Sequence, residues 1–324
     1  MGNGEYKKLM EYAVKAPSGH NAQPWKFKVE GNRISIYPDY ERNLPVADPE
    51  NRGLFISLGC ALENLLIAAE HFGYSTTVRM MPEGGSMEYI EVELFQEKQP
   101  RHHVLFHFIE ARQTTRNRYN RADIPKKDLE RLKGAAVQEK VLMKLLIEPV
   151  DIEPVIHLAK EATMKRFSNK DLASELKNWI RFDKRSAERT GDGIFSATLG
   201  LPSGPRWLGS FFMDLGRNPK REALKTAREM ESASGVMVFV AQEKSREAWV
   251  NLGRSFQRSA LMATSLNINH THLNVVCTEP DFREELAELL QLKPGAEPLL
   301  VIRIGYSKKM PYSFRRPVRE VLVN

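Results

Sequence analysis

The chain has 324 residues, of which 42% are hydrophobic, and its 48 lysines and arginines exceed its 41 acidic residues by a net charge of +7. This composition excludes a collagen-like, low-complexity or wholly disordered chain, and the length favours two domains. Two cysteines are too few for a disulfide framework, and the N-terminus has no signal-peptide pattern, so we expect a cytoplasmic protein.

The positive charge is unevenly distributed. Residues 1–110 have a net charge of −4 and residues 111–324 a net charge of +11. Such a balance can indicate nucleic acid, an anionic membrane or an acidic small ligand. Only charge supports nucleic acid, and no apolar run approaches the roughly 18 residues of a membrane span. We therefore expect neither partner, and the second part of the chain needs another explanation.

The first part of the chain predicts a helix, a hairpin, a long buried helix and three strands. Apolar spacing identifies the helices, strict alternation the strands, and a Gly-Asn turn the hairpin. The ranges are 5–16 for the first helix, 25–29 and 34–37 for the hairpin, 53–73 for the long helix, and 76–81, 89–95 and 104–108 for the strands, with a loop at 83–86.

The second part predicts a similar mixture of helices and strands after a domain seam near 105–115, so the fold class is α+β. Its helices are expected at 125–136, 152–189, 248–267 and 281–290, and its strands at 141–147, 236–241, 273–276 and 299–304. Five glycines and two prolines in residues 190–210 predict a mobile loop or lid.

Two of these helices resemble each other. Residues 59–73 align with residues 253–267, and Gly59 then matches Gly253. One interpretation is that any two buried amphipathic helices align this well. The other is a gene duplication whose two long helices pack across a pseudo-two-fold axis, where the glycines would let the backbones approach each other.

A polar loop at residues 16–27 has side chains that could bind a ligand. It offers a hydroxyl, two amides, an imidazole and several backbone N–H groups within a few residues. Such a loop can satisfy the polar edge of a planar heteroaromatic ligand. The alternative is an ordinary capped turn in which Ser18 and Asn21 bond local backbone.

Arginines form two further motifs. Arg112 and Arg116 are spaced i,i+4, so they share one face of a helix, and their two guanidinium groups suit a phosphate dianion. The alternative is a solvated basic face. The tail, residues 308–318, follows a buried strand and ends in Arg315 and Arg316; taken alone, it is also consistent with a disordered basic tail.

Together these three segments resemble the nitroreductase family of FMN-dependent oxidoreductases. That family has an Arg-x-Ser/Thr-x-Lys/Arg segment, a Pro-Ser-x-x-Asn-x-Gln-Pro-Trp loop and an arginine near a C-terminal proline. Here the loop at 17–25 precedes the arginine segment at 112–116, so each half of the chain lacks what the other has. The two half-sites complete one site if the chain is a fused pseudo-dimer. The resemblance covers most of the chain and is closest to the two-domain Acg-like branch.

The resemblance implies an α+β fold of two fused homologous α/β-sheet domains, residues 1–108 and 109–324, that form an intramolecular pseudo-dimer. It also implies a set of FMN-binding residues. These are Arg112, Thr114, Arg116 and Arg315, with Arg316 as a second candidate, for the phosphate, and Pro17, Ser18, Asn21 and Gln23 for the isoalloxazine; Arg254 and Gln257 on the second long helix are expected near the flavin.

The implied function is an FMN-dependent oxidoreductase in which NAD(P)H drives the reduction of nitroaromatics, quinones or similar acceptors by ping-pong hydride transfer. The chemistry then resides on the flavin, with no catalytic side chain and no metal. The implied partner is a small-molecule electron acceptor, and the chain is expected to be monomeric or weakly self-associating. The alternative function is an FMN-binding or sequestering protein with a lidded flavin and little or no turnover.

Overall fold

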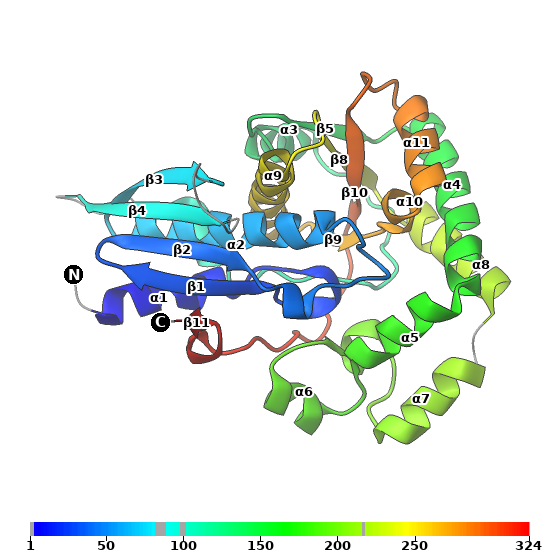
Figure 1. Ribbon diagram of the computed structural model, residues 1–324. Helices are drawn as coiled ribbons and strands as arrows, with labels where there is room; N and C mark the ends of the chain where they lie inside the picture. Colours follow the sequence, from blue (N-terminus) through cyan, green and yellow to red (C-terminus); the bar gives the residue numbers. More distant parts are fainter. Residues whose placement is uncertain (1–2, 82–88, 98–101, 216–217, 324) are drawn as a thin grey trace.

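The computed structural model describes residues 3–81, 89–97, 102–215 and 218–323, so the loop expected at 83–86 lies outside the described residues (Figure 1). Two mostly antiparallel sheets pack against a central pair of long helices. A group of helices from the second half covers the outer face of the second sheet. Both ends of the chain lie beside the first sheet.

The first sheet has the strand order β11-β1-β2-β4-β3. The alternating segments 25–29 and 34–37 form the predicted hairpin, in which Phe27 lies opposite Ile36. The strands are β1 (Trp25–Glu30), β2 (Arg33–Pro38), β3 (Tyr74–Met80), β4 (Ile90–Gln96) and the C-terminal β11 (Leu322–Val323). The elements around them are α1 (Asn3–Ala13), η1 (Gly19–Asn21), η2 (Tyr40–Arg42), α2 (Arg52–His71), η3 (Val104–Phe108) and η5 (Val318–Glu320).

The second sheet has the order β5-β8-β10-β9. Its strands are β5 (Val141–Leu146), β8 (Gly235–Ala241), β9 (Asn269–His272) and β10 (Glu297–Gly305). Its helices are α3 (Lys126–Ala135), α4 (Pro149–Ser168), α5 (Lys170–Trp179), α6 (Lys184–Thr190), α7 (Arg206–Leu215), α8 (Pro219–Glu231), α9 (Arg246–Ser265), α10 (Val275–Thr278) and α11 (Pro280–Leu289). Two short strands, β6 (Ile180–Arg181) and β7 (Ile194–Phe195), form a third sheet, followed by η4 (Ser196–Leu199).

The two large sheets have the same topology. In each half, two antiparallel strands come before a 20-residue helix and two after it, and the sheet order is first, second, fourth, third. Thus β1-β2-β4-β3 corresponds to β5-β8-β10-β9, and α2 corresponds to α9. The expectation of two related halves in an α+β fold is confirmed. The main difference is the insertion of α4 to α8 between β5 and β8, where the first half has only a tight turn.

The paired helices meet through the two aligned glycines. A Cβ atom on Gly59 would lie 2.0 Å from the Val250 carbonyl oxygen, and one on Gly253 would lie 2.0 Å from the Ile56 carbonyl oxygen. The same sequence offset separates Ile56 from Val250 and Gly59 from Gly253, so the contact is symmetric. Only a residue without a side chain permits this approach, and the duplication is therefore visible at the axis itself.

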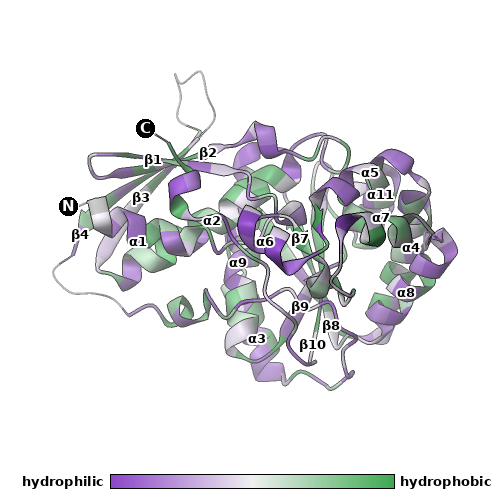
Figure 2. Ribbon diagram, turned by 90° about the horizontal axis from the view of Figure 1, so that it is seen from below, coloured by the Kyte–Doolittle hydropathy of each residue, from purple (hydrophilic) through white to green (hydrophobic). Residues whose placement is uncertain are grey.

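The central strand β8 joins two hydrophobic cores. Met237 and Phe239 point to the core shared with the long helices, whereas Val236, Val238 and Val240 point to a core formed with α4 and α11. This alternation follows the period of two of a strand. In Figure 2 the outer helices α4 and α8 carry both hydrophobic and hydrophilic residues, as expected for helices with one face on a core.

Helix α2 is more hydrophobic than its interrupted sequence suggests. Within the described residues it is the one helix long and apolar enough to cross a membrane by length and composition, with a mean hydropathy of 1.5 over 18 residues. This corrects the expectation that no run approaches that length. In this structure 83% of that window is buried, because α2 packs between the first sheet and α9.

Three predicted elements are wrong. Residues 104–108 form a 3₁₀ helix instead of a strand, because Leu105 and Ile109 both pack against the long helices. The strand expected at 273–276 lies earlier, at 269–272. It ends there because the Asn274 side chain accepts the hydrogen bond from the Val301 N–H, and helix α10 begins at Val275. The helix expected at 152–189 breaks at Asn169, whose side chain caps α5.

Candidate functional site

Two adjoining cavities lie between the two halves of the chain. The smaller has a volume of about 80 Å³ and the larger of about 390 Å³, and the larger volume lies within the usual range of small-molecule sites. Pro17, Ser18, His20, Arg116 and Ile194 line both. The candidate site therefore combines the loop after α1 with residues from the second half.

The loop that separates the cavities has an unusual backbone. His20, Asn21 and Gln23 have φ angles of +51°, +55° and +55°, a region that costs a residue with a side chain roughly 1–2 kcal/mol. Tertiary contacts hold the loop there, because the Asn21 amide donates to Gly193 O at 2.9 Å and to Phe314 O at 3.1 Å. Backbone strain of this kind gathers at functional sites.

Pro17, Ser18 and Asn21, which the resemblance assigns to the isoalloxazine, line the smaller cavity, and Pro17 and Ser18 also line the larger one. Gln23 does not line either cavity. Its amide is fully buried, donates to Gly191 O at 2.8 Å and accepts from the Arg316 N–H at 2.9 Å. We therefore correct its expected position: Gln23 fastens the loop to two other segments and does not face a ligand.

The arginine segment is extended and not helical, which corrects the basis of the i,i+4 argument. Thr114 forms a parallel bridge with His270, and the Thr115 N–H donates to His270 O at 2.9 Å. On an extended backbone, residues two apart share one face. Arg112, Thr114 and Arg116 accordingly all line the smaller cavity.

Arg315 completes this group from the C-terminal tail. Its Nε donates to Ala16 O at 3.2 Å, and it lines the same small cavity. Arg316 turns away, because its Nε lies 3.7 Å from a Glu320 carboxylate oxygen and its Nη2 donates to Glu320 O. The structure thus separates the two candidates for the phosphate and leaves Arg316 outside the cavity.

None of the three cavity arginines has an ion-pair partner among the described residues. Arg112 donates to Lys15 O at 3.0 Å and Arg116 to Thr198 O at 3.2 Å, both neutral carbonyls. Burial lowers the pKa of Arg112 to about 10 and, together with the charge of Arg112, the pKa of Arg315 to about 9. Shielded cations are costly unless paired, so this cluster is a favourable place for an anion.

Arg254 and Gln257 are not cavity residues, which corrects the expectation for the second long helix. Arg254 Nε donates to Glu63 at 2.9 Å, and Gln257 Nε2 donates to Asn64 Oδ1 at 2.6 Å. Both contacts cross the interface between α9 and α2. Buried polar groups need hydrogen-bond partners. These side chains find their partners on the opposite helix, and the contacts therefore hold the two halves together.

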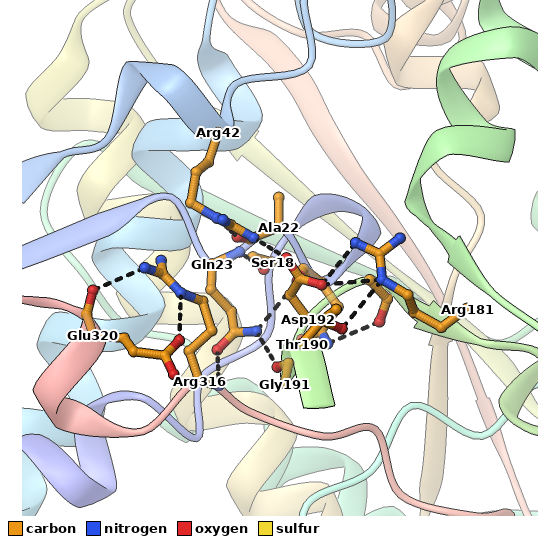
Figure 3. A network of polar contacts seen from close by, with 12 residues as sticks. Ser18, Ala22, Gln23, Arg42, Arg181, Thr190, Gly191, Asp192, Arg316 and Glu320 are labelled. Carbon is orange, nitrogen blue, oxygen red and sulfur yellow. Dashed lines mark hydrogen bonds and ion pairs between the residues drawn. The ribbon is translucent and has the colours of Figure 1, made fainter. Parts of the chain in front are cut away.

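Residues 190–210 are only partly the mobile loop or lid that composition suggested. Residues 191–196 are buried, and 200–203 are largely exposed. Asp192 accepts from Arg181 at 2.7 Å and pairs with Arg42, so it joins three segments in the network of Figure 3. The first part of the segment is therefore a fixed wall of the site.

Sequence reasoning missed the lining residues Ile194 and Thr198, and it named the imidazole of His20 only as one group of the polar loop, without a role in binding. His20 lies inside the loop that the motif identified, so its position was the available signal. Ile194 and Thr198 come from the inserted segment and have no counterpart in the first half. Only the chain path around β6 and β7 brings them to the loop.

The comparisons with known proteins agree with the sequence resemblance. No family model matches the chain. The chain is 24% identical over 330 residues to the Mycobacterium tuberculosis protein named "Putative NAD(P)H nitroreductase acg", covering 97% of this chain and 94% of that protein. It is 21% identical over 324 residues to "Putative NAD(P)H nitroreductase Rv3131" of the same organism, covering 97% and 90%. The expected resemblance to nitroreductases is confirmed.

The chain is also similar to solved structures. One of the similar structures is a nitroreductase with bound FMN from Bacteroides fragilis, with 17% identity and a TM-score of 0.39 over 66% of this chain and 93% of that one. The two related halves are seen within the chain itself, in the matching sheet orders.

Proposed function

We propose that this protein is an NAD(P)H-dependent flavin oxidoreductase that holds FMN between its two halves. The observation that carries the proposal is the convergence of Arg112, Arg116 and Arg315 on one small cavity, where none of them has an ion-pair partner in the part of the chain that the structure describes. That cavity adjoins a larger one through the loop at 17–21. The same activity is supported by relatives that match 97% of this chain and are named putative NAD(P)H nitroreductases.

The residues present fit FMN. The Arg112 Nε donor and the Asn21 Oδ1 acceptor are buried without a partner in the described structure, and both residues line the small cavity. The Thr114 hydroxyl lies on the same wall. A phosphate would accept from guanidinium groups and the hydroxyl, and charge-assisted bonds of this kind are about twice as strong as neutral ones.

Each part of the chain has a distinct task in this proposal. Arg112, Arg116 and Arg315 bind the phosphate, Thr114 donates to it, and Pro17, Ser18 and Asn21 border the ring. Bound FMN supplies hydride chemistry. The fixed wall at 191–196 keeps water from that side of the site. We propose that NAD(P)H and an acceptor such as a nitroaromatic or a quinone enter the larger cavity in turn, in a ping-pong scheme that needs no acid or base from the chain.

The phosphate role of Arg112 is tested by comparing FMN with riboflavin, which lacks the phosphate. An Arg112→Met substitution should weaken FMN binding about 10- to 100-fold, the equivalent of one charge-assisted hydrogen bond, with a much smaller effect on riboflavin. Flavin fluorescence titration measures both affinities. Arg189→Met, at an exposed position on α6, is the matched control. Equal losses for FMN and riboflavin in Arg112→Met would contradict the assignment.

A flavin-sequestering protein is the second candidate. The observation in its favour is the fixed wall, since the loop and the wall bond to each other through Asn21 and Gly193 in both directions. The two functions differ in whether a reductant reaches the flavin. We expect NADPH to bleach the flavin absorbance of the reconstituted protein anaerobically, and a nitroaromatic to restore it. A flavin that stays oxidised over many minutes would favour sequestration.

A further inference from the structure

We propose that Arg166 binds an oxyanion carried by the electron acceptor, so that the acceptor is a small aromatic acid with a separate reducible substituent, such as a nitro group, and not a neutral nitroaromatic or quinone. This inference rests on the proposed function. It concerns a residue that the sequence motifs did not identify and that lies outside the phosphate cluster. Arg166 lines the larger cavity and not the smaller one.

Arg166 reaches the cavity from the last turn of α4, in the insertion that the first half lacks. Its Nη1 donates to the Thr278 hydroxyl at 2.9 Å, and Thr278 in turn donates to Val275 O. Among the described residues, the bond to Thr278 is the only hydrogen bond of the Arg166 side chain. One guanidinium edge is thus fixed by a neutral hydroxyl, and the remaining N–H groups are free to meet a ligand.

The other arginines of the larger cavity are already engaged. Arg116 belongs to the phosphate cluster. The remaining ones form ion pairs: Arg42 with Asp192, Arg52 with Glu50 and Glu297, and Arg283 with Glu297. Among the described arginines that line this cavity, Arg166 is the one that has no ion pair and does not belong to the phosphate cluster.

Nearby carboxylates do not neutralise Arg166. Glu279 lies 3.9 Å from Lys165, and Glu175 accepts from the backbone N–H groups of Val46 and Ala47. Neither carboxylate forms an ion pair with Arg166 in the described structure. Burial lowers the pKa of Arg166, while these two acids raise it, and a guanidinium stays charged in proteins. Arg166 is therefore a cation of this cavity that has no carboxylate at ion-pair distance among the described residues.

His20 lies near both Arg166 and Arg116. Burial and these two charges lower the pKa of His20 to about 4, so its imidazole is neutral near pH 7 and adds no third charge. A neutral imidazole donates from one nitrogen and accepts at the other. The loop that borders the ring thus offers a hydrogen-bonding group close to the proposed anion position.

The shape and lining of the cavity indicate the class of anion. Ile56, Phe256 and Leu300 line the same 390 Å³ space, so an aromatic ring can pack there while a charged substituent meets Arg166. A guanidinium binds a carboxylate through two parallel hydrogen bonds. An aromatic carboxylate satisfies both requirements. The 2′-phosphate of NADPH has related chemistry, and the experiment distinguishes the two sources.

The test compares 4-nitrobenzoate with 4-nitrobenzamide, which has a similar shape and no charge. Isothermal titration of the purified protein should show tighter binding of 4-nitrobenzoate. In Arg166→Met the preference for the acid over the amide should fall about tenfold or more, and Arg166→Lys should restore part of it. The ratio of kcat/KM values for the two acceptors should follow the same order. Arg185→Met, exposed on α6, should keep the wild-type preference.

Three results would overturn the inference. The wild-type protein could bind the acid no better than the amide, or Arg166→Met could weaken both equally, which would indicate a structural role. Arg166→Met could instead lower the preference for NADPH over NADH and leave the acid preference unchanged, which would assign the charge to the 2′-phosphate. Failure of the proposed function is recognised separately. It would appear as a lack of FMN binding in the flavin titration, whereas the titration with 4-nitrobenzoate tests Arg166 independently of that result.

Discussion

Individual polar residues in this protein act by connecting segments that are distant in sequence. Gln23 bonds to Gly191 and to Arg316, so one amide joins the first loop, the inserted segment and the tail. Asp192 joins Arg42 and Arg181 in the same region (Figure 3). These contacts explain how a loop with three left-handed residues keeps its shape. They also make the site sensitive to changes that touch no ligand.

The Asp192 network should depend on pH. Burial raises the pKa of Asp192, but the bonds from Arg181 and Arg42 outweigh it and hold the pKa below the ordinary 3.8. As the pH falls, Asp192 is therefore protonated in the unfolded chain before it is protonated in the folded protein. The stability that the Asp192 ion pairs contribute is present above about pH 4 and is lost as the pH falls through the folded pKa. Asp192→Asn should lower the free energy of unfolding by about 2 kcal/mol or more at pH 7, since it leaves two guanidinium groups without their charged partner.

Urea unfolding at pH 7 and at pH 3 measures this effect. The difference between the wild-type protein and Asp192→Asn should shrink at the lower pH, because the Asp192 carboxyl of the unfolded chain is then mostly protonated. Glu188→Gln, at an exposed position on α6, is the control and should change little at either pH. A difference that is the same at both pH values would show that Asp192 does not titrate as described.

The paired helices α2 and α9 determine how the two halves meet. Their backbones approach at Gly59 and Gly253, and beside this contact Glu63 accepts from Arg254 at 2.9 Å and from Arg258 at 2.6 Å. The buried carboxylate has two cations and is therefore compensated. The close backbone contact and the adjacent salt bridges to Glu63 together specify one register of the two helices. This register in turn aligns the loop of one half with the arginines of the other.

Gly253→Ala should separate these helices. The added methyl group would lie 2.0 Å from the Ile56 carbonyl oxygen, and overpacking in a core typically costs about 1–3 kcal/mol, with larger values where backbone must move. Thermal and urea unfolding measure the loss. Gly134→Ala is a matched control in helix α3, where the methyl group meets nothing within 4 Å, and it should stabilise the protein by about 0.5–1 kcal/mol. Equal effects of the two substitutions would contradict the contact.

The molecule as a whole is closed by its C-terminal tail. After β10 in the second sheet, the tail carries Arg315 to the small cavity and ends in β11, which pairs in parallel with β1 of the first sheet. Val318 and Val321 are buried in the core of the first half. Because of this return, the division at 108 and 109 is a proposal about ancestry and not a boundary between independent folding units.

Truncation after residue 310 should remove both functions of the tail. The variant should bind FMN at least about 10- to 100-fold more weakly, from the loss of one charged contact, and should melt at a lower temperature because Val318 and Val321 leave the core. Arg315→Met in the full chain separates the two effects, since it should weaken FMN binding with a smaller change in melting temperature. Full FMN affinity in the truncated chain would contradict the proposed phosphate site.

A single copy of the chain should suffice for the site. Both half-sites lie in one chain, so no second subunit is needed to bring the loop to the arginines. We expect static light scattering after size exclusion to give a mass near 37.0 kDa, with weak self-association at most. A stable dimer whose dissociation releases FMN would contradict this expectation.

The sequence alone carried the local information. Alternation and turn residues predicted the hairpin at 25–37, and a nearly continuous apolar stretch predicted the buried helix α2, because these patterns depend on neighbouring residues. The two glycines and the split motifs predicted the duplication. The same motifs identified Arg112, Thr114, Arg116 and the loop at 17–21 as residues that belong near one another.

The tertiary structure decided what depends on distant partners. It separated Arg315, which donates to the distant Ala16 O, from Arg316, which lies beside the Glu320 carboxylate. It placed Gln23, Arg254 and Gln257 in contacts between segments and not in the cavity. Arg166 became visible only through the path of the inserted helix α4. Whether a cation is paired depends on which carboxylates the fold brings within a few ångströms, and a linear pattern of residues does not contain those distances.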